Sequence, residues 1–516
     1  MTTFSRHLRL VALLTALIAT TAYAQPLPAA PPPMPTASDL NWPTERAPRP
    51  LSAPSVKFPE YEMHTLPNGL RVVIVQQHEQ PSVTLRMVVR AGAAYDPKDK
   101  AGVATLVASL LDQGTTTKTA QQIADTIDFI GGGLGAGAGT DLSYVNVIIM
   151  KDSLDLGLNL MSDVMRHPAF ANEELGRQRE QILSGLKVSY DDPDYVANAV
   201  IDRLIYGFHP YGRPSSGTPE SVSSITHEDL VAFHNAYFVP NNSIMAVVGD
   251  VVPAEALAMV TKVFGDWDKR EVPSFPMTDP PPPTRRALVI DRPDSAQTEI
   301  RVGQLAIPRN HPDYLALNVA INILGGEGGN RLQGVLRSDR GLTYGASADM
   351  HTYKRAGGII ADTDTRTETT AEALRVVVDE ISRLQRERVG DAELSNAQAY
   401  LAGNFPLTIE TPDSIAMQVL NSLFYELDVK ELETYRERVN AITADDIQRV
   451  ARAYLKPSSL SVVLVGDAAK FIKQLKGVGF DNVEMISLSD LDLTTGDFHK
   501  ARSGVPTAKP GDGGAK

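Results

Sequence analysis

The sequence predicts an α+β protein made of two homologous halves, each a mixed sheet with helices, joined by a proline-rich linker. Residues 220–250 and 437–467 align without a gap at an offset of 217 residues. A match of this length at one fixed offset indicates an internal duplication. Runs with strand and helix periodicity occur in both halves without strict alternation, which favours α+β over a parallel α/β fold.

The duplicated segment has the same predicted structure in both copies. A threonine caps an amphipathic helix, a proline turn follows, and a short apolar strand then ends in glycine and aspartate. The identical pairs include Ile225/Ile442, Thr226/Thr443, Asp229/Asp446, Tyr237/Tyr454, Pro240/Pro457, Gly249/Gly466 and Asp250/Asp467.

Four further elements follow from local periodicity. Residues 70–75 and 83–89 alternate well enough to predict strands, and residues 119–130 and 369–386 have helical periodicity. Each half therefore contains both kinds of element.

The two ends of the chain and its middle differ in composition from the halves. Arg6 and Arg9, the apolar run 10–20 and the small-x-small residues 22–24 have the pattern of a cleaved secretory signal. We therefore expect a periplasmic protein, with an uncleaved anchor as the alternative. No later run is apolar for long enough to span a membrane. The expected organisation is a signal peptide at 1–24, a proline-rich spacer at 25–58, the first half at 59–268, a proline-rich linker at 269–285, the second half at 286–492 and a disordered tail at 493–516.

Composition excludes several functions. The 516 residues contain 49 Lys and Arg against 62 Asp and Glu, a formal net charge of −13, which argues against nucleic acid as the main partner. The chain has no cysteine, so disulfides, thiolate zinc sites and a catalytic thiol are impossible.

The order of several short motifs resembles the insulinase/pitrilysin family of zinc peptidases over roughly residues 60–470. This resemblance implies that the two halves are arranged as a clam-shell. The motifs are Leu66-Pro67-Asn68-Gly69-Leu70-Arg71-Val72, Gly102-Val103-Ala104 through Gly114-Thr115, Ile130-Gly131-Gly132, His209-Pro210-Tyr211, Val248-Gly249-Asp250 and Leu324-Gly325-Gly326 through Arg337 to Tyr344.

The residues that would bind zinc in this family are replaced. The family needs H-x-x-E-H on a helix, with two histidine ligands and a glutamate that activates water, and a distal glutamate as third ligand. Here the histidine positions are Thr105 and Ser109, the base position is Ala108, and the distal position is Gly185. Alanine and glycine have no side-chain donor, and neutral hydroxyls are poor zinc ligands. We therefore expect no metal site in this chain and no peptide hydrolysis by the chain alone.

The resemblance implies that a second pair of functional residues is retained. Arg337 and Tyr344 occupy the positions of an arginine and a tyrosine that reach the zinc site in the family. The tyrosine hydroxyl can donate to the oxyanion of a tetrahedral intermediate, and the arginine can hold a substrate carbonyl. The alternative is an exposed arginine at a helix end and a core tyrosine.

Two glycine-rich segments and one histidine pair allow functional and purely structural interpretations. Gly325, Gly326, Gly328 and Gly329 form either a turn before a helix or, by resemblance to non-catalytic subunits, a loop that contacts peptide. The run 131–139 is either an edge strand that accepts an extended peptide or a tightly packed strand. His227, Glu228 and His234 could share a helical face and bind a metal, but ordinary surface histidines are the favoured interpretation.

The resemblance leads to one leading hypothesis and two alternatives. The chain is expected to be the non-catalytic subunit of a periplasmic heterodimeric zinc peptidase. It would bind unfolded or extended peptides and supply Arg337 and Tyr344 in trans to a homologous H-x-x-E-H subunit that carries the zinc. The first alternative is a non-enzymatic peptide-binding or assembly scaffold of the same fold. The second is an independent peptidase with an unrecognised site.

Overall fold

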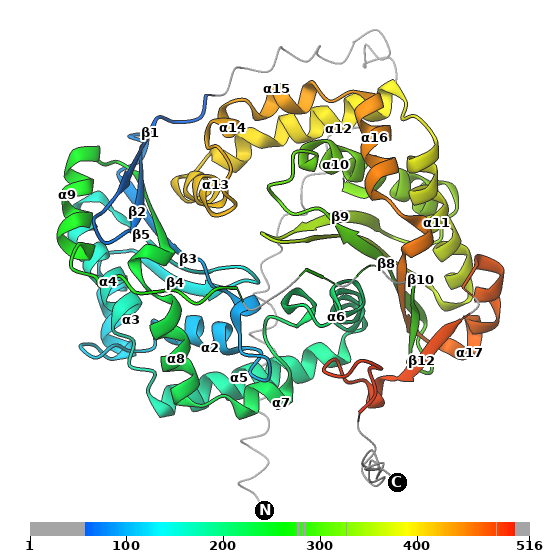
Figure 1. Cartoon of the computed structure of the whole chain (residues 1–516), viewed down its shortest axis with the longest axis horizontal. Helices are drawn as coiled ribbons and strands as arrows, with labels where there is room; N and C mark the ends of the chain where they lie inside the picture. Colours follow the sequence, from blue (N-terminus) through cyan, green and yellow to red (C-terminus); the bar gives the residue numbers. More distant parts are fainter. Residues whose placement is uncertain are drawn as a thin grey trace, which may run out of the picture. The chain divides into compact units, whose positions relative to one another are not determined.

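The computed structural model describes residues 57–275, 279–280, 282, 285–326, 328–480 and 482–500. They form two six-stranded mixed sheets, one in each half, with helices packed on them (Figure 1). The predicted α+β class with two homologous halves is therefore confirmed. The predicted signal peptide and nearly all of the spacer lie outside the described residues.

The first sheet combines parallel and antiparallel strands. β2 and β6 run parallel, and every other neighbouring pair is antiparallel. The strands in spatial order are β1 (Tyr61–Thr65), β2 (Arg71–Gln76), β6 (Ser243–Gly249), β3 (Ser82–Val89), β5 (Ser143–Met150) and β4 (Gly133–Ala138). β1 and β4 are consequently the edge strands of this sheet.

The second sheet repeats five of these strands in the same order. The strands are β12 (Val483–Ser487), β7 (Ala287–Asp291), β11 (Ser461–Gly466), β8 (Gln297–Ala306), β10 (Gly357–Arg366) and β9 (Ala346–Thr352). The difference lies at one edge, because β12 runs parallel to β7 whereas β1 runs antiparallel to β2. The outer strand of each sheet therefore has a different direction relative to its neighbour in the two halves.

The duplicated segments have the predicted structure. Helices α8 (His227–Tyr237) and α16 (Ala444–Tyr454) each begin with a capping box, in which the threonine hydroxyl and the aspartate three residues later exchange hydrogen bonds with each other's backbone N–H groups. A short 3₁₀ turn beginning at Pro240 or Pro457 then leads into β6 or β11. These signals are local, which is why they could be read from the sequence.

The remaining helices follow the chain between the strands. In the first half they are α2 (Val103–Leu110), α3 (Ala120–Phe129), α4 (Leu154–Arg166), α5 (Asn172–Asp191), α6 (Pro193–Tyr206), α7 (Pro219–Ser224) and α9 (Pro253–Phe264). In the second half they are α10 (Tyr314–Ile321), α11 (Thr370–Arg386), α12 (Asp391–Asn404), α13 (Pro412–Phe424), α14 (Lys430–Glu433), α15 (Tyr435–Asn440) and α17 (Ala468–Phe471). α3 and α11 agree with the predicted helices to within one residue.

One helix of each half packs on the sheet of the other half. α6 packs against β8 and β11, and α13 packs against β3 and β6. The two shared cores combine side chains of both halves, such as Val200 with Val463 and Val419 with Val248. The opposite faces of the sheets pack on helices of their own half. Burial of these apolar surfaces stabilises the halves as one unit.

A matching pair of ion contacts accompanies the exchanged helices. On β3, the Arg86 guanidinium lies 3.1 Å from the carboxylate of Asp413, in the first turn of α13. On β8, Arg301 pairs with Asp194, in the first turn of α6. Arg86 lies opposite Ala246 and Arg301 opposite Val463, which are 217 residues apart, so the two arginines are equivalent by the duplication. The pairs therefore fix both helix starts in the same way.

The end of the second half differs from the expectation of a disordered tail starting at residue 493. Leu493 and Phe498 are buried in the core that α6 shares with the second sheet. The Arg203 guanidinium also donates to the carbonyl of Leu493 at 3.1 Å. Residues 493–500 are thus packed because they supply apolar side chains, and only 501–516 of the expected tail lie outside the described residues.

Within the described part of the chain, no helix combines the length and the apolar character needed to cross a bilayer.

Candidate functional site

The resemblance in sequence places the family's histidine and glutamate positions for zinc on helix α2. Its N-cap residue is Gly102, whose φ of +101° favours glycine. The buried Asp96 carboxylate accepts hydrogen bonds from the N–H groups of Gly102 and Ala104 at 2.7 and 2.8 Å. Burial raises the pKa of Asp96 to about 7, and these hydrogen bonds partly oppose that rise. Asp96 therefore caps the helix rather than facing its outer surface.

The structure places Thr105, Ala108 and Ser109 on one side of α2, as the helical spacing predicts. The Thr105 hydroxyl donates to the carbonyl of Ser215 at 2.7 Å, and the Ser109 hydroxyl donates to Leu106 within its own helix at 3.0 Å. α5, which carries the exposed Gly185, packs against α2. The two helices are therefore neighbours, and the hydroxyls of Thr105 and Ser109 are engaged with backbone carbonyls.

These residues do not fit a zinc ion. Ala108 and Gly185 offer no donor, and both hydroxyls already bind backbone carbonyls. Zinc in proteins is bound by imidazole, thiolate and carboxylate groups. Across the described residues, no group of three or more His, Asp or Glu side chains is arranged to hold a metal.

The histidine pair on α8 also differs from expectation. His234 is buried rather than on the surface, and its Nε2 lies 2.8 Å from the carbonyl of Met165. Its ring stacks on Phe238. Burial lowers the pKa of His234 to about 4, so the ring is neutral at pH 7. His234 is therefore a satisfied core residue and not half of a metal site with His227.

Arg337 and Tyr344 are both on the surface. Arg337 is exposed in the π-helical segment η6 (Gln333–Asp339), and the Tyr344 side chain is 84% exposed. Among the described residues, neither side chain has a hydrogen-bond or ion-pair partner, so both are free to bind a ligand. The alternative of a core tyrosine is wrong, because the neighbours Leu342 and Ala346 take the buried positions on either side.

The loop that presents Tyr344 is held in place on both sides. The carbonyls of Leu342 and Gly345 accept hydrogen bonds from the hydroxyls of Thr365 and Thr363 at 2.8 and 2.9 Å. These threonines lie near the end of β10, which is paired on both sides, with β8 and with β9. A ring on a fixed loop loses less conformational entropy on binding than one on a mobile loop.

The glycine-rich segment 325–329 has a buried part and an exposed part. Gly325 is buried, and a Cβ there would lie 2.1 Å from the backbone nitrogen of Ala348 on β9. A Cβ at Gly326 would lie 2.4 Å from the Asn322 amide. Packing against backbone therefore requires glycine at position 325, whereas a side chain at position 326 would have to displace the Asn322 amide. The expectation of a peptide-contacting loop did not include this packing role. Gly328 and Gly329 are exposed.

The glycine-rich run 131–139 contains the edge strand β4. It pairs with β5 on one side, which places Gly133 opposite Ile148 and Gly135 opposite Asn146. A Cβ at Gly133 or at Gly135 would meet no atom within 4 Å, so the packing of the described residues does not require glycine there. Glycine in a strand often marks the close approach of a ligand or another backbone.

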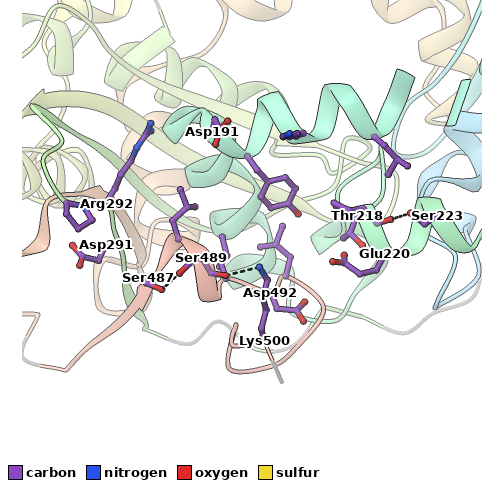
Figure 2. Close-up of a pocket in the computed structure, with 18 residues that line it drawn as sticks. Asp191, Thr218, Glu220, Ser223, Asp291, Arg292, Ser487, Ser489, Asp492 and Lys500 are labelled. Atoms are coloured by element: carbon purple, nitrogen blue, oxygen red, sulfur yellow. Dashed lines mark hydrogen bonds between the residues drawn. The ribbon is translucent and has the colours of Figure 1, made fainter. Parts of the chain in front are cut away.

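Two pockets lie away from all of these positions. One, of about 1040 Å³, lies between α5, α7 and the segments that follow β7 and β12 (Figure 2). It is lined by Leu183 and Lys187 of α5, two residues either side of Gly185, so Gly185 lies on the opposite helix face. The other, of about 540 Å³, adjoins Arg203. Sequence reasoning pointed to neither pocket.

Comparison with known protein families agrees with this architecture. The sequence model of the insulinase family, peptidase family M16, matches residues 71–218, and the model of the peptidase M16 inactive domain matches residues 224–401. Together they cover more than half of the chain. The chain belongs to the insulinase family.

Several relatives cover most of this chain. An uncharacterized zinc protease of Mycobacterium leprae is 27% identical over 79% of this chain and 92% of its own length. A probable mitochondrial-processing peptidase subunit beta of Arabidopsis thaliana is 23% identical over 79% of this chain and 78% of its own. A solved peptidase M16 inactive domain from Pseudomonas fluorescens has a TM-score of 0.75 and 28% identity, covering 79% of this chain and 98% of that one. A protease from Helicobacter pylori, 22% identical over 79% of this chain and 99% of its own, has the same fold at a TM-score of 0.75.

Proposed function

We propose that this chain is the non-catalytic subunit of a periplasmic heterodimeric zinc peptidase. It binds extended peptides and supplies Arg337 and Tyr344 in trans to a homologous subunit that carries H-x-x-E-H and the zinc ion. The mature chain reaches the periplasm through the signal pattern at residues 1–24.

A contrast between two sites carries this proposal. At Thr105, Ala108, Ser109 and Gly185 the donors that zinc requires are replaced, and the remaining hydroxyls serve the local backbone. At Arg337 and Tyr344 a guanidinium and a phenol are exposed without partners in the described part of the chain. Exposed, unpaired polar groups on a fixed loop are suited to a ligand that comes from outside.

The roles of the pair follow from its chemistry. The Tyr344 hydroxyl donates a hydrogen bond to the oxyanion that forms when a peptide carbonyl becomes tetrahedral. The Arg337 guanidinium holds a neighbouring substrate carbonyl through charge-assisted hydrogen bonds. Neither group needs a metal in this chain.

The β4 edge supports peptide binding. Unpaired backbone groups of an edge strand can pair with an extended peptide, and this mode of addition requires no particular side chain. The open space at Gly133 and Gly135 lies beside the exposed Ile148, which offers an apolar contact for a peptide side chain. Unfolded peptides therefore fit this edge better than folded proteins do.

The alternative is a peptide-binding or assembly scaffold with no catalytic role. The same β4 edge favours it, since strand addition alone explains the open glycines. The Arg337 and Tyr344 pair distinguishes the two functions, because a scaffold has no chemical reason to expose it. The name of the Arabidopsis relative, a peptidase subunit, supports the heteromeric enzyme.

Reconstitution tests the proposal. The mature chain is purified alone and together with the most similar H-x-x-E-H homologue of the same organism. Bound zinc and cleavage of an unstructured quenched peptide are measured for both samples. We expect the chain alone to be free of stoichiometric zinc and inactive, and the mixture to form a stable complex that cleaves faster than the homologue alone. Stoichiometric zinc in the single chain, or activity that ignores its presence, would contradict the proposal.

A further inference from the structure

A pocket of about 540 Å³ lies where the end of α6, the start of α7 and the C-terminal segment meet. We call it the Arg203 pocket. Its volume is within the range of sites for small ligands. Its apolar walls are Ala101, Phe208, Pro210, Pro214 and Leu493, and its polar residues are Asp96, Lys98, Asp99, Arg203, Arg213, Thr218, Glu220, Ser221 and Thr494.

Arg203 is a buried cation without an acidic partner in the part of the chain that the structure describes. It is only 6% exposed, and no carboxylate lies within ion-pair distance of it among the described residues. Its Nε donates to the carbonyl of Leu493 at 3.1 Å and its Nη2 to the carbonyl of Thr495 at 3.4 Å. Nη1 makes no hydrogen bond to a described residue. Burying a cation without a counter-ion is costly, so an anion that reaches Nη1 would be bound favourably.

The other charged groups of the pocket bind backbone groups or lie at its rim, although the Nε of Arg213 is buried without a hydrogen-bond partner among the described residues. Arg213 donates to backbone carbonyls of residues 96–98, and the Asp96 carboxylate caps α2. Lys98, Asp99 and Glu220 are exposed. Among the described residues neither Arg203 nor Arg213 has a carboxylate partner, and Arg203 is the more deeply buried of the two.

The surroundings of Arg203 favour a planar anion. The Phe208 ring covers one face of the guanidinium, with the carbon Cζ 3.6 Å from the ring centroid, and this leaves the edge of the guanidinium as the place for a ligand. Phe208 is 67% exposed, so its ring also offers an apolar surface at the pocket. Burial and the nearby Arg286 lower the pKa of Arg203 to about 10, so the group stays charged at pH 7.

We propose that the Arg203 pocket binds a carboxylate group attached to an apolar body, with the carboxylate on Arg203 and the apolar body against Phe208 and the two prolines. Guanidinium and carboxylate match in geometry and charge. Such a group occurs in small aromatic or aliphatic acids and at the C-terminus of a peptide that ends in an apolar residue.

Calorimetric titration of the full mature chain tests this inference. The probes are 4-phenylbutyrate and its neutral amide, and a tripeptide ending in phenylalanine with a free or an amidated C-terminus. We expect at least one of the two acids to bind at least tenfold more tightly than its own amide. The acid with the lower Kd identifies the source of the carboxylate. If neither acid binds more tightly than its amide, the proposal is wrong.

Two variants locate the site. Arg203→Met keeps an apolar side chain against the Phe208 ring and removes the charge, so it should bind acid and amide equally. Lys98→Met removes a rim charge and should keep the preference for the acid. If Arg203→Met does not fold, Phe208→Ala replaces it and should weaken binding of the acid at least tenfold. Two results would place the binding site elsewhere and overturn the assignment. One is a preference for the acid in folded Arg203→Met that equals that of wild type. The other, if Phe208→Ala is used instead, is an affinity for the acid that equals that of wild type.

Discussion

At the scale of single residues, two groups of predicted site residues differ in how their polar side chains are engaged. Thr105 and Ser109 keep the spacing of two ligands on one helix face, but each donates its hydroxyl proton to a carbonyl within the chain. Arg337 and Tyr344 show the reverse, since their polar ends are exposed and lack partners among the described residues. The residues that act on the substrate's reacting carbonyl are therefore expected in the second half, whereas the β4 edge of the first half is proposed to bind the peptide backbone.

His234 predicts a pH dependence of stability. Its folded pKa is lowered to about 4, whereas an unfolded histidine titrates near 6.5. The unfolded chain then binds the extra proton between these values, so stability is fully present above about pH 6.5 and falls as the pH drops towards 4, by about 3 kcal/mol in total. His234→Phe packs against the same rings and cannot be protonated. Its free energy of unfolding should therefore fall by about 3 kcal/mol less than that of wild type between pH 7 and pH 4.

Urea unfolding at pH 7, 5.5 and 4 measures this difference. His227→Gln, at a partly exposed position of the same helix, serves as the control and should follow wild type. Parallel pH profiles for wild type and His234→Phe would show that His234 is not the titrating group.

At the scale of elements, the parts encoded by local signals were predictable. The threonine caps of α8 and α16, their proline turns and the strands that follow all lie in short stretches whose chemistry can be read directly. The exchange of α6 and α13 was not predictable, because their apolar faces do not indicate which sheet they cover. The packing role of Gly325 was also hidden, since it depends on Ala348 of a strand later in the chain.

The β4 edge gives a prediction at this scale. A valine at Gly135 has room for its Cβ and suits a strand better than glycine, so Gly135→Val should raise the free energy of unfolding by about 0.5–1 kcal/mol. The same side chain fills the open space beside β5. Binding of an unstructured peptide with large apolar residues should weaken about tenfold, which corresponds to about 1.4 kcal/mol.

Fluorescence anisotropy and urea unfolding measure the two effects. Gly176→Ala on α5 is the matched control, because its Cβ also meets no atom within 4 Å and alanine favours a helix by about 1 kcal/mol over glycine. It should gain similar stability without a change in affinity. Unchanged peptide affinity in Gly135→Val would remove β4 from the binding surface.

At the scale of the whole molecule, the duplication created two halves that hold each other and differ in their surface chemistry. The equivalent pairs Arg86–Asp413 and Arg301–Asp194 connect each sheet to the helix that the other half supplies, so this contact between the halves is repeated. The predicted sites are not symmetric, since Thr105, Ala108, Ser109 and Gly185 of the first half offer no set of zinc donors and the second half exposes Arg337 and Tyr344. The sequence motifs could identify these positions, but only the structure shows that Tyr344 is exposed and held on a fixed loop.

The most direct test of the central claim is kcat of the reconstituted complex carrying Tyr344→Phe, measured at saturating peptide. Tyr400→Phe is the control, because Tyr400 is also partly exposed and lies on α12. If the Tyr344 hydroxyl stabilises the transition state in trans, kcat should fall by about 10²–10³ with little change in KM, while the control keeps wild-type activity. A kcat for Tyr344→Phe equal to that of the control would contradict a catalytic contribution from this chain.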